Sequence, residues 1–216
     1  MKKFIVLIVS VIISINLFAQ SKGQPIYSIS NNEICSNNLF ITNPTESIST
    51  LDYTPMYHNK IKVGDSVYIL RMSRFKGWEN DPGDFDVIVF YNKGTKALTF
   101  KNEYGIVRLD NPRNLYTSRL KQFSSNNYFF ERELTPDSKA IIFLGQHYGT
   151  DLPYLIIFVA TPNQIKLVYC KKMGLKSFGS DPDSFSLLIQ SNINEEGAPP
   201  ITHTIREENG VLWFYE

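Results

Sequence analysis

The sequence predicts an all-β fold, mainly antiparallel, arranged as a sandwich or a barrel-like sheet. Apolar runs of strand length recur along the chain, and they are rich in Ile, Val, Phe and Tyr. Gly, Pro, Asn or Thr separates the runs at intervals of about 8–12 residues. The clearest runs are residues 140–144, 154–160 and 165–169. We expect these three to form neighbouring buried strands around which the others pack.

The first 19 residues predict a signal peptide. Lys2 and Lys3 precede an apolar stretch at 4–18, and Ala19 precedes a polar stretch. The apolar stretch is shorter than the roughly 20 residues that span a bilayer. The first cysteine, Cys35, lies too far away for a lipoprotein anchor. We therefore expect cleavage after Ala19 and a soluble periplasmic or secreted protein.

The net charge argues against nucleic acid and anionic membranes as partners. The chain has 22 Lys and Arg against 21 Asp and Glu, a formal net charge of +1. Loss of Lys2 and Lys3 would leave 20 against 21, or −1. A nearly neutral protein lacks the charge excess of a nucleic-acid or anionic-membrane binder. We therefore expect neither among the partners.

Two cysteines, Cys35 and Cys170, allow two interpretations. An oxidising compartment would permit a disulfide between them. Alternatively both are unpaired thiols, with Cys170 buried in a strand. Neither lies near a histidine, so the pair does not predict a zinc site.

The N-terminal part of the mature chain differs in composition from the rest. Residues 20–59 are rich in Asn, Ser and Thr, which predicts an extended edge segment. Residues 60–216 are expected to form the β-rich globular domain. Within it, Gly64-Asp65 predicts a turn between two strands, and residues 92–95 predict the turn of a hairpin over 85–102.

The middle and C-terminal parts predict one helix and further strands. Pro112 follows a capping Asn111, so a short helix is expected near 112–123. Strands are expected at 128–134 and 185–190, whereas the Gly- and Ser-rich residues 174–182 predict a connection.

Asn209-Gly210 is a preferred pair for a type I′ turn, and it predicts a closing hairpin over 201–216. The turn fixes the register, so that Ile205 faces Phe214 and Arg206 faces Trp213. We expect Phe214 to be buried with Ile205. We expect Arg206 and Trp213 to form a cation–π pair on the other face.

An acidic loop at 79–86 is the main candidate for chemistry. It contains Glu79, Asp81, Asp84 and Asp86 around a Pro-Gly turn. Asp81, Asp84 and Asp86 are candidate calcium ligands, and the four carboxylates are candidate acid–base residues of a hydrolase. The spacing is not that of an EF-hand, so a solvated turn is the favoured interpretation.

The function predicted from these patterns is that of an exported, non-catalytic binding protein. No stretch carries a specific catalytic or cofactor motif, so no cofactor is predicted and we do not favour an enzyme. The partner would be a protein, peptide or glycan, as for an inhibitor or immunity-type protein. The alternatives are a secreted hydrolase that uses the acidic loop and a barrel-type carrier of an apolar ligand. The candidate binding surface comprises Trp78, His147, Tyr148 and Trp213.

Overall fold

The computed structural model describes residues 23–42, 52–77, 85–106, 129–146, 153–181, 184–191 and 198–216. Most of these residues lie in β-strands, and every ladder between the strands is antiparallel. The predicted all-β, mainly antiparallel fold class is therefore confirmed. The predicted signal peptide at 1–19 and the predicted helix near 112–123 lie outside the described residues. No helix in the described ranges is long and apolar enough to span a membrane.

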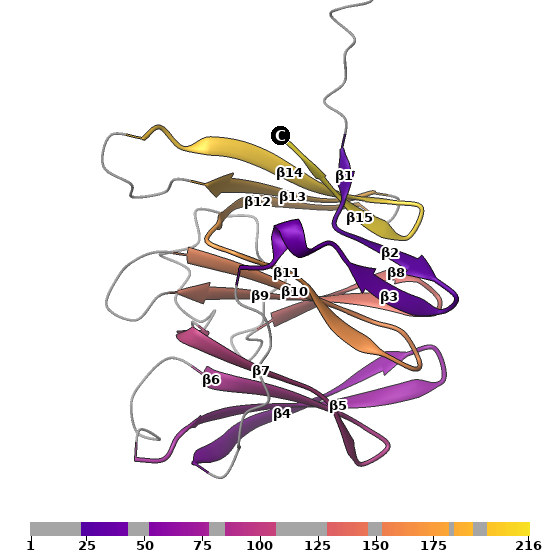
Figure 1. Ribbon diagram of the computed structural model, residues 1–216, viewed down its shortest axis with the longest axis vertical. Helices are drawn as coiled ribbons and strands as arrows, with labels where there is room; N and C mark the ends of the chain where they lie inside the picture. The colour runs from indigo at the N-terminus through magenta and orange to yellow at the C-terminus, as the bar shows by residue number, and fades with distance from the viewer. Residues whose placement is uncertain are drawn as a thin grey trace, which may run out of the picture.

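Three antiparallel meanders, consecutive in the sequence, are stacked as three layers (Figure 1). The bottom sheet comprises β4 (Tyr53–Val63), β5 (Ser66–Phe75), β6 (Phe85–Asn92) and β7 (Thr95–Ile106). The middle sheet comprises β8 (Phe129–Thr135), β9 (Ser138–Gln146), β10 (Pro153–Ala160) and β11 (Ile165–Lys171). The top sheet comprises β12 (Gly174–Asp181), β13 (Ser184–Ser191), β14 (Ile201–Glu208) and β15 (Val211–Tyr215), with β1 (Gln24–Pro25) added beside β15.

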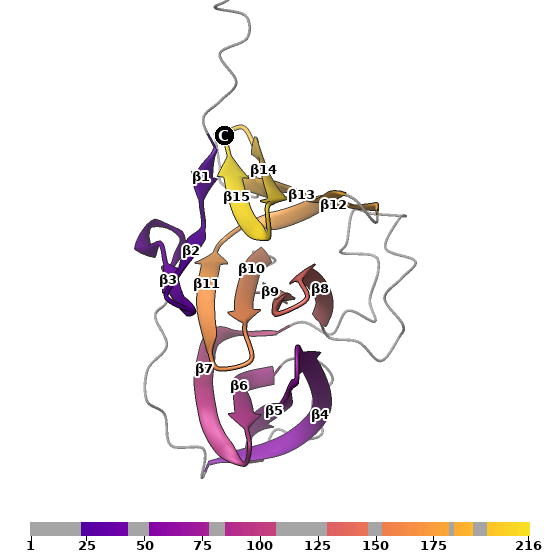
Figure 2. The ribbon, with the colours of Figure 1, turned by 90° about the vertical axis from the view of Figure 1, so that its right-hand side faces the viewer.

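The last strands of the three meanders, β7, β11 and β15, lie on the same side of the stack (Figure 2). Each sheet is open, with a different strand at each of its two edges. The architecture is thus a three-layered sandwich, which settles the predicted choice between sandwich and barrel.

The middle sheet is buried on both faces because it lies between two hydrophobic cores. On β10, Leu155, Ile157 and Val159 belong to the upper core, which the middle sheet shares with the top sheet. Ile156 and Phe158 belong to the lower core, shared with the bottom sheet. A strand buried on both faces needs apolar residues at every position. This explains the unbroken apolar run at 154–160. The prediction that residues 140–144, 154–160 and 165–169 form neighbouring buried strands is confirmed.

The tight turns fold as predicted. Lys93-Gly94 joins β6 to β7, and Asn209-Gly210 joins β14 to β15. All four residues have positive φ, as a type I′ turn requires. In the closing hairpin Ile205 pairs with Phe214 and Arg206 with Trp213, so the predicted register is confirmed. Ile205 and Phe214 are both buried, also as predicted.

The N-terminal segment lies along β11, which forms one edge of the middle sheet. It comprises β2 (Tyr27–Ser30), β3 (Glu33–Ser36) and the short helix η1 (Asn38–Phe40). The hydroxyl groups of Ser36 and Thr42 donate hydrogen bonds, each of 2.8 Å, to the carbonyls of Leu167 and Cys170 on β11. An edge strand covered in this way cannot pair with another chain.

The structure corrects one expectation about the elements. Residues 174–182 were expected to be a connection, but Gly174–Asp181 form β12, which pairs with β13 over its length. The ladder hydrogen bonds of β12 come from its backbone, so a Gly- and Ser-rich sequence can still form an edge strand. The first residues of β4, from Tyr53, belong to the segment 20–59, which was expected to be extended and at an edge, and β4 is an edge strand of the bottom sheet.

Candidate functional site

The outer face of the bottom sheet, turned away from the lower core, gathers basic side chains from three strands and one turn. We call it the cationic face, and we define it by Lys60, Lys62, Arg71, Lys93 and Lys96 with the apolar Val67, Ile69 and Tyr91. Cross-strand pairing fixes its layout. One row runs Lys60, Ile69, Tyr91, Lys96, and the next row toward the β4–β5 turn holds Lys62 and Val67. Inward-facing neighbours such as Ile61, Tyr68 and Phe90 belong to the lower core.

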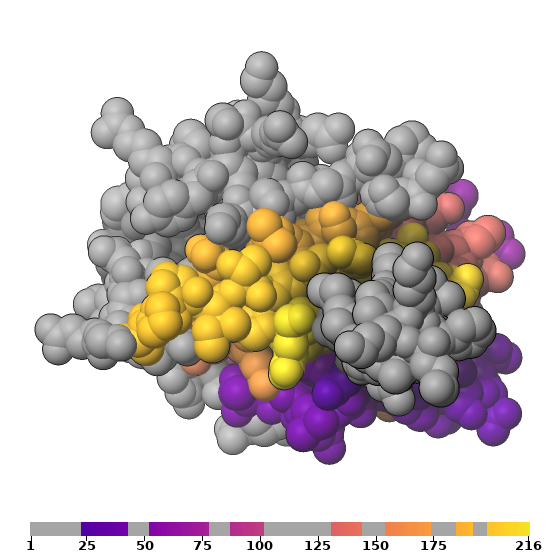
Figure 3. All heavy atoms as spheres, turned by 90° about the horizontal axis from the view of Figure 1, so that it is seen from above, coloured from indigo at the N-terminus to yellow at the C-terminus, as the bar shows by residue number. Residues whose placement is uncertain are grey.

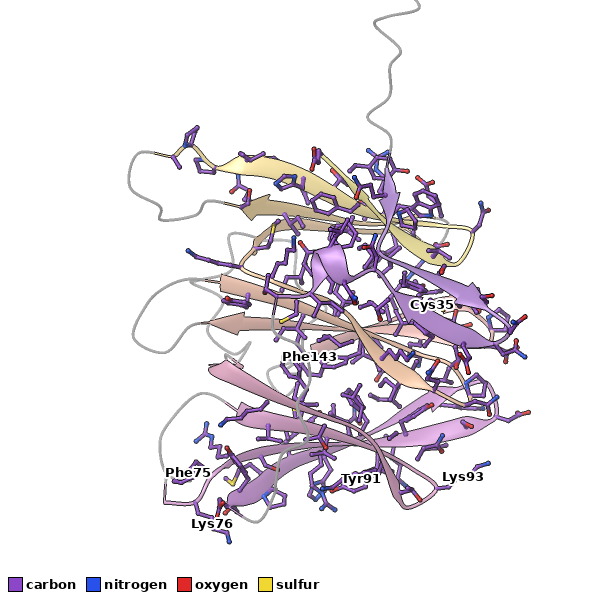
Figure 4. All side chains as sticks on the ribbon, in the orientation of Figure 1. Cys35, Phe75, Lys76, Tyr91, Lys93 and Phe143 are labelled. Carbon is purple, nitrogen blue, oxygen red and sulfur yellow. The ribbon has the colours of Figure 1, made fainter. Side chains whose placement is uncertain are left out.

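The arginine of this face is held in place by an aromatic ring. The Arg71 guanidinium carbon lies 5.0 Å from the centre of the Tyr91 ring, a cation–π contact. Its Nε is buried and has no hydrogen-bond partner among the described residues. The contact with Tyr91 restricts the guanidinium, so that less conformational entropy is lost when it binds an acceptor. Figure 4 shows Tyr91 and Lys93 at the lower edge of the molecule, away from the lower core where Phe143 lies.

The cationic face is positively charged although the chain is nearly neutral. None of its five cations forms an ion pair within the described ranges, and none of the described residues in its rows is a carboxylate. The nearest acidic residue in the sequence is Asp65, in the β4–β5 turn. Setting these five aside leaves 17 of the 22 basic residues against 21 acidic ones, so the remainder of the chain is net acidic.

Apolar side chains lie among these charges, and one of them is exposed. Val67 is 44% exposed, and Ile69 and Tyr91 are half-buried. Toward the other end of the same outer face, Val87 and Val89 are fully buried. The accessible part therefore lies near the β4–β5 and β6–β7 turns.

The outer face of the top sheet (Figure 3) also carries an arginine stacked on a tyrosine, which can be compared with Arg71. Arg206 lies there with its guanidinium carbon 5.3 Å from the centre of the Tyr215 ring. The predicted cation–π partner was Trp213, which pairs directly with Arg206 but is half-buried. Arg206 instead stacks on Tyr215, the diagonal neighbour two residues further along β15. Tyr215 donates a hydrogen bond to the carboxylate of Glu208, and this bond is the main cause of a raised Tyr215 pKa. Arg206 is thus accompanied by a carboxylate, unlike Arg71.

A second polar group lies at the edge of the upper core. His203 stacks on Phe214 with ring centres 5.0 Å apart, and its Nε2 is 3.0 Å from the hydroxyl of Ser191. Burial lowers the pKa of His203, Glu216 opposes that shift and Lys171 adds to it. Nδ1 of His203 has no partner among the described residues. A Ser–His pair needs an orienting acceptor at that nitrogen to act as a catalytic triad, so this geometry does not support a hydrolase site.

The cysteines are a correction to the candidate disulfide. Cys35 and Cys170 are not joined by a disulfide. Cys35 lies on the exposed face of β3, whereas Cys170 is fully buried in the lower core, so the two side chains face different surroundings. The structure thus agrees with the alternative interpretation, in which no disulfide forms and Cys170 is buried in a strand.

Most of the other predicted site residues cannot be placed. Trp78, Glu79, Asp81, Asp84, His147 and Tyr148 lie outside the described residues. Asp86 lies on β6, where only the backbone is described. Within the described ranges, no group of three His, Cys, Asp or Glu is arranged to hold a metal ion.

Sequence reasoning missed the cationic face. Its members are scattered over residues 60–96, and they come together only through the register of four strands. The one local signal was the alternation of Lys60 and Lys62 with Ile61 and Val63, which indicates an outward-facing basic edge.

Comparison with known proteins adds nothing to this picture. No family, no curated protein and no solved structure matches the chain.

Proposed function

We propose that the protein is exported and acts as a non-catalytic binding protein, with the cationic face as its docking surface. One observation carries the proposal: Arg71 is positioned by Tyr91 on a sheet face whose lysines form no ion pairs with the described residues. Like charges on one surface repel one another, and a partner of opposite charge would relieve that repulsion.

The composition of the face supports binding rather than general solubility. Protein interfaces are enriched in Arg and Tyr at their centre and carry polar groups at their rim. The cationic face follows this pattern, with Arg71 and Tyr91 on its inner strands and lysines on its edge strands.

Site-specific photo-cross-linking in bacterial cells that export the protein tests the proposal. A photoreactive amino acid is placed at Val67, on the cationic face, and separately at Thr202, an exposed position on the top sheet. We expect a discrete adduct from position 67 and none from position 202. Equal labelling at both positions, or none at position 67 in folded and exported protein, would contradict the proposal.

A further inference from the structure

We propose that the partner of the cationic face is a protein whose acidic side chains surround an apolar centre. This inference rests on the proposed function and concerns the chemistry of the partner. It begins from the way the side chains are divided among the strands. Ile69 and Arg71 lie on β5 and Tyr91 on β6, the two inner strands of the sheet. Lys60 and Lys62 lie on β4, and Lys96 lies on β7, the two edge strands.

This division gives the face an apolar and aromatic centre with a basic rim. Tyr and Arg at the centre of an interface supply most of the affinity, and the rim excludes water from them. Lysines at a rim contribute chiefly to the rate of association, because their charges act over a Debye length of about 8–10 Å. The complementary surface must therefore present apolar atoms opposite Ile69 and Tyr91, and carboxylates opposite the lysines.

The dimensions exclude a small anion as the complete ligand. Lys60 and Lys96 belong to strands three spacings apart, so their backbones are separated by about 14 Å. A single phosphate or carboxylate cannot contact both ends of that row. An extended partner is needed, either a folded protein surface or a polymer.

The apolar centre favours a protein over a polyanion. Nucleic acids and sulfated glycans present closely spaced anions and would leave the exposed Val67 and half-buried Ile69 without apolar contacts. The planar guanidinium of Arg71, stacked on Tyr91, is suited to a bidentate bond with one carboxylate. A surface that alternates Asp or Glu with Leu or Phe satisfies both requirements.

Titration of the isotope-labelled protein, residues 20–216, with four probes tests the inference by NMR. The probes are a blocked nonapeptide alternating Glu and Leu, an equally long one alternating Glu and Ser, a heparin hexasaccharide, and a short DNA duplex. We expect the Glu–Leu peptide to shift the amide signals around Ile69, Arg71 and Tyr91, and to bind at least about tenfold more tightly than the Glu–Ser peptide. Arg71→Glu should weaken that binding at least about tenfold, since it replaces attraction by repulsion.

Arg206→Glu is the matched control, because it reverses the charge of the other arginine stacked on a tyrosine. It should leave the affinity for the Glu–Leu peptide within about twofold of that of the unchanged protein.

Tighter binding of heparin or DNA than of the Glu–Leu peptide would overturn the inference in favour of a polyanion. Equal affinity for the two peptides would contradict the inference that the partner has an apolar centre. If no probe binds but the cross-link at position 67 is found, this inference fails and the proposed function stands. If that cross-link is absent, the proposed function itself fails.

Discussion

Two neighbouring residues of β10 provide the sharpest test of the three-layered fold. Ile156 belongs to the lower core and Ile157 to the upper core, and both are 0% exposed. In a two-layered sandwich, neighbouring residues alternate between core and solvent, so only one of the two substitutions would be costly. Here Ile156→Ala and Ile157→Ala should each lower the free energy of unfolding by about 2–5 kcal/mol, through lost burial and the cavity left behind. Either loss is a large part of the roughly 5–15 kcal/mol that stabilises a typical domain.

Urea denaturation of the two variants measures these losses, and the top sheet supplies a matched control. Leu187 is 0% exposed in the upper core, whereas Leu188 is half-buried on the outer face of the same strand. Leu187→Ala should cost about 2–5 kcal/mol and Leu188→Ala clearly less, about 1 kcal/mol. A loss below about 1 kcal/mol for either isoleucine, with an unchanged urea dependence, would refute burial on both faces of the middle sheet.

Three further predictions concern His203, the closing turn and processing. The lowered pKa of His203 means that the folded state binds its proton less readily than the unfolded state, whose value is near 6.5. Its contribution to stability should be complete above that pH and lost as the pH falls through the folded pKa, so denaturation profiles of His203→Gln should be flatter between pH 7 and 5. Gly210→Val should cost more than Gly94→Val in thermal melts. Both residues have positive φ, but a Cβ at Gly210 would also collide with Thr135, whereas nothing lies within 4 Å of a Cβ at Gly94. Equal losses of melting temperature in the two variants would contradict this contact. N-terminal sequencing of exported protein should begin at Gln20, and an intact Met1 in the membrane fraction would contradict the predicted signal peptide.

The parts of the fold that sequence reasoning predicted depend on local chemistry. Asn209-Gly210 determines its own turn geometry, and with it the pairing of Ile205 with Phe214. The continuous apolar run at 154–160 indicates burial on both faces, because a half-buried strand would alternate.

The parts that sequence reasoning missed depend on partners distant in the chain. The Gly- and Ser-rich β12 is a strand because β13 supplies its ladder. The surroundings of Cys35 and Cys170 depend on how β3 lies along β11. The stacking of Arg206 on Tyr215, rather than on Trp213, depends on how the side chains pack across the closing hairpin. The cationic face was missed for the same reason, since Lys60, Arg71 and Lys96 come to lie on one face of a sheet only after three ladders have formed.

The most direct test of the cationic face is the salt dependence of association with the partner recovered by the cross-link at Val67. Stopped-flow or surface-based kinetics would be recorded at about 20 mM and 500 mM salt, conditions that span Debye lengths of roughly 20 to 4 Å. We predict that the association rate falls at least about tenfold while the dissociation rate changes little, and that Lys60→Glu with Lys96→Glu removes most of the salt dependence. An association rate that is independent of salt, in a complex that still forms at position 67, would contradict docking through the charge of this face.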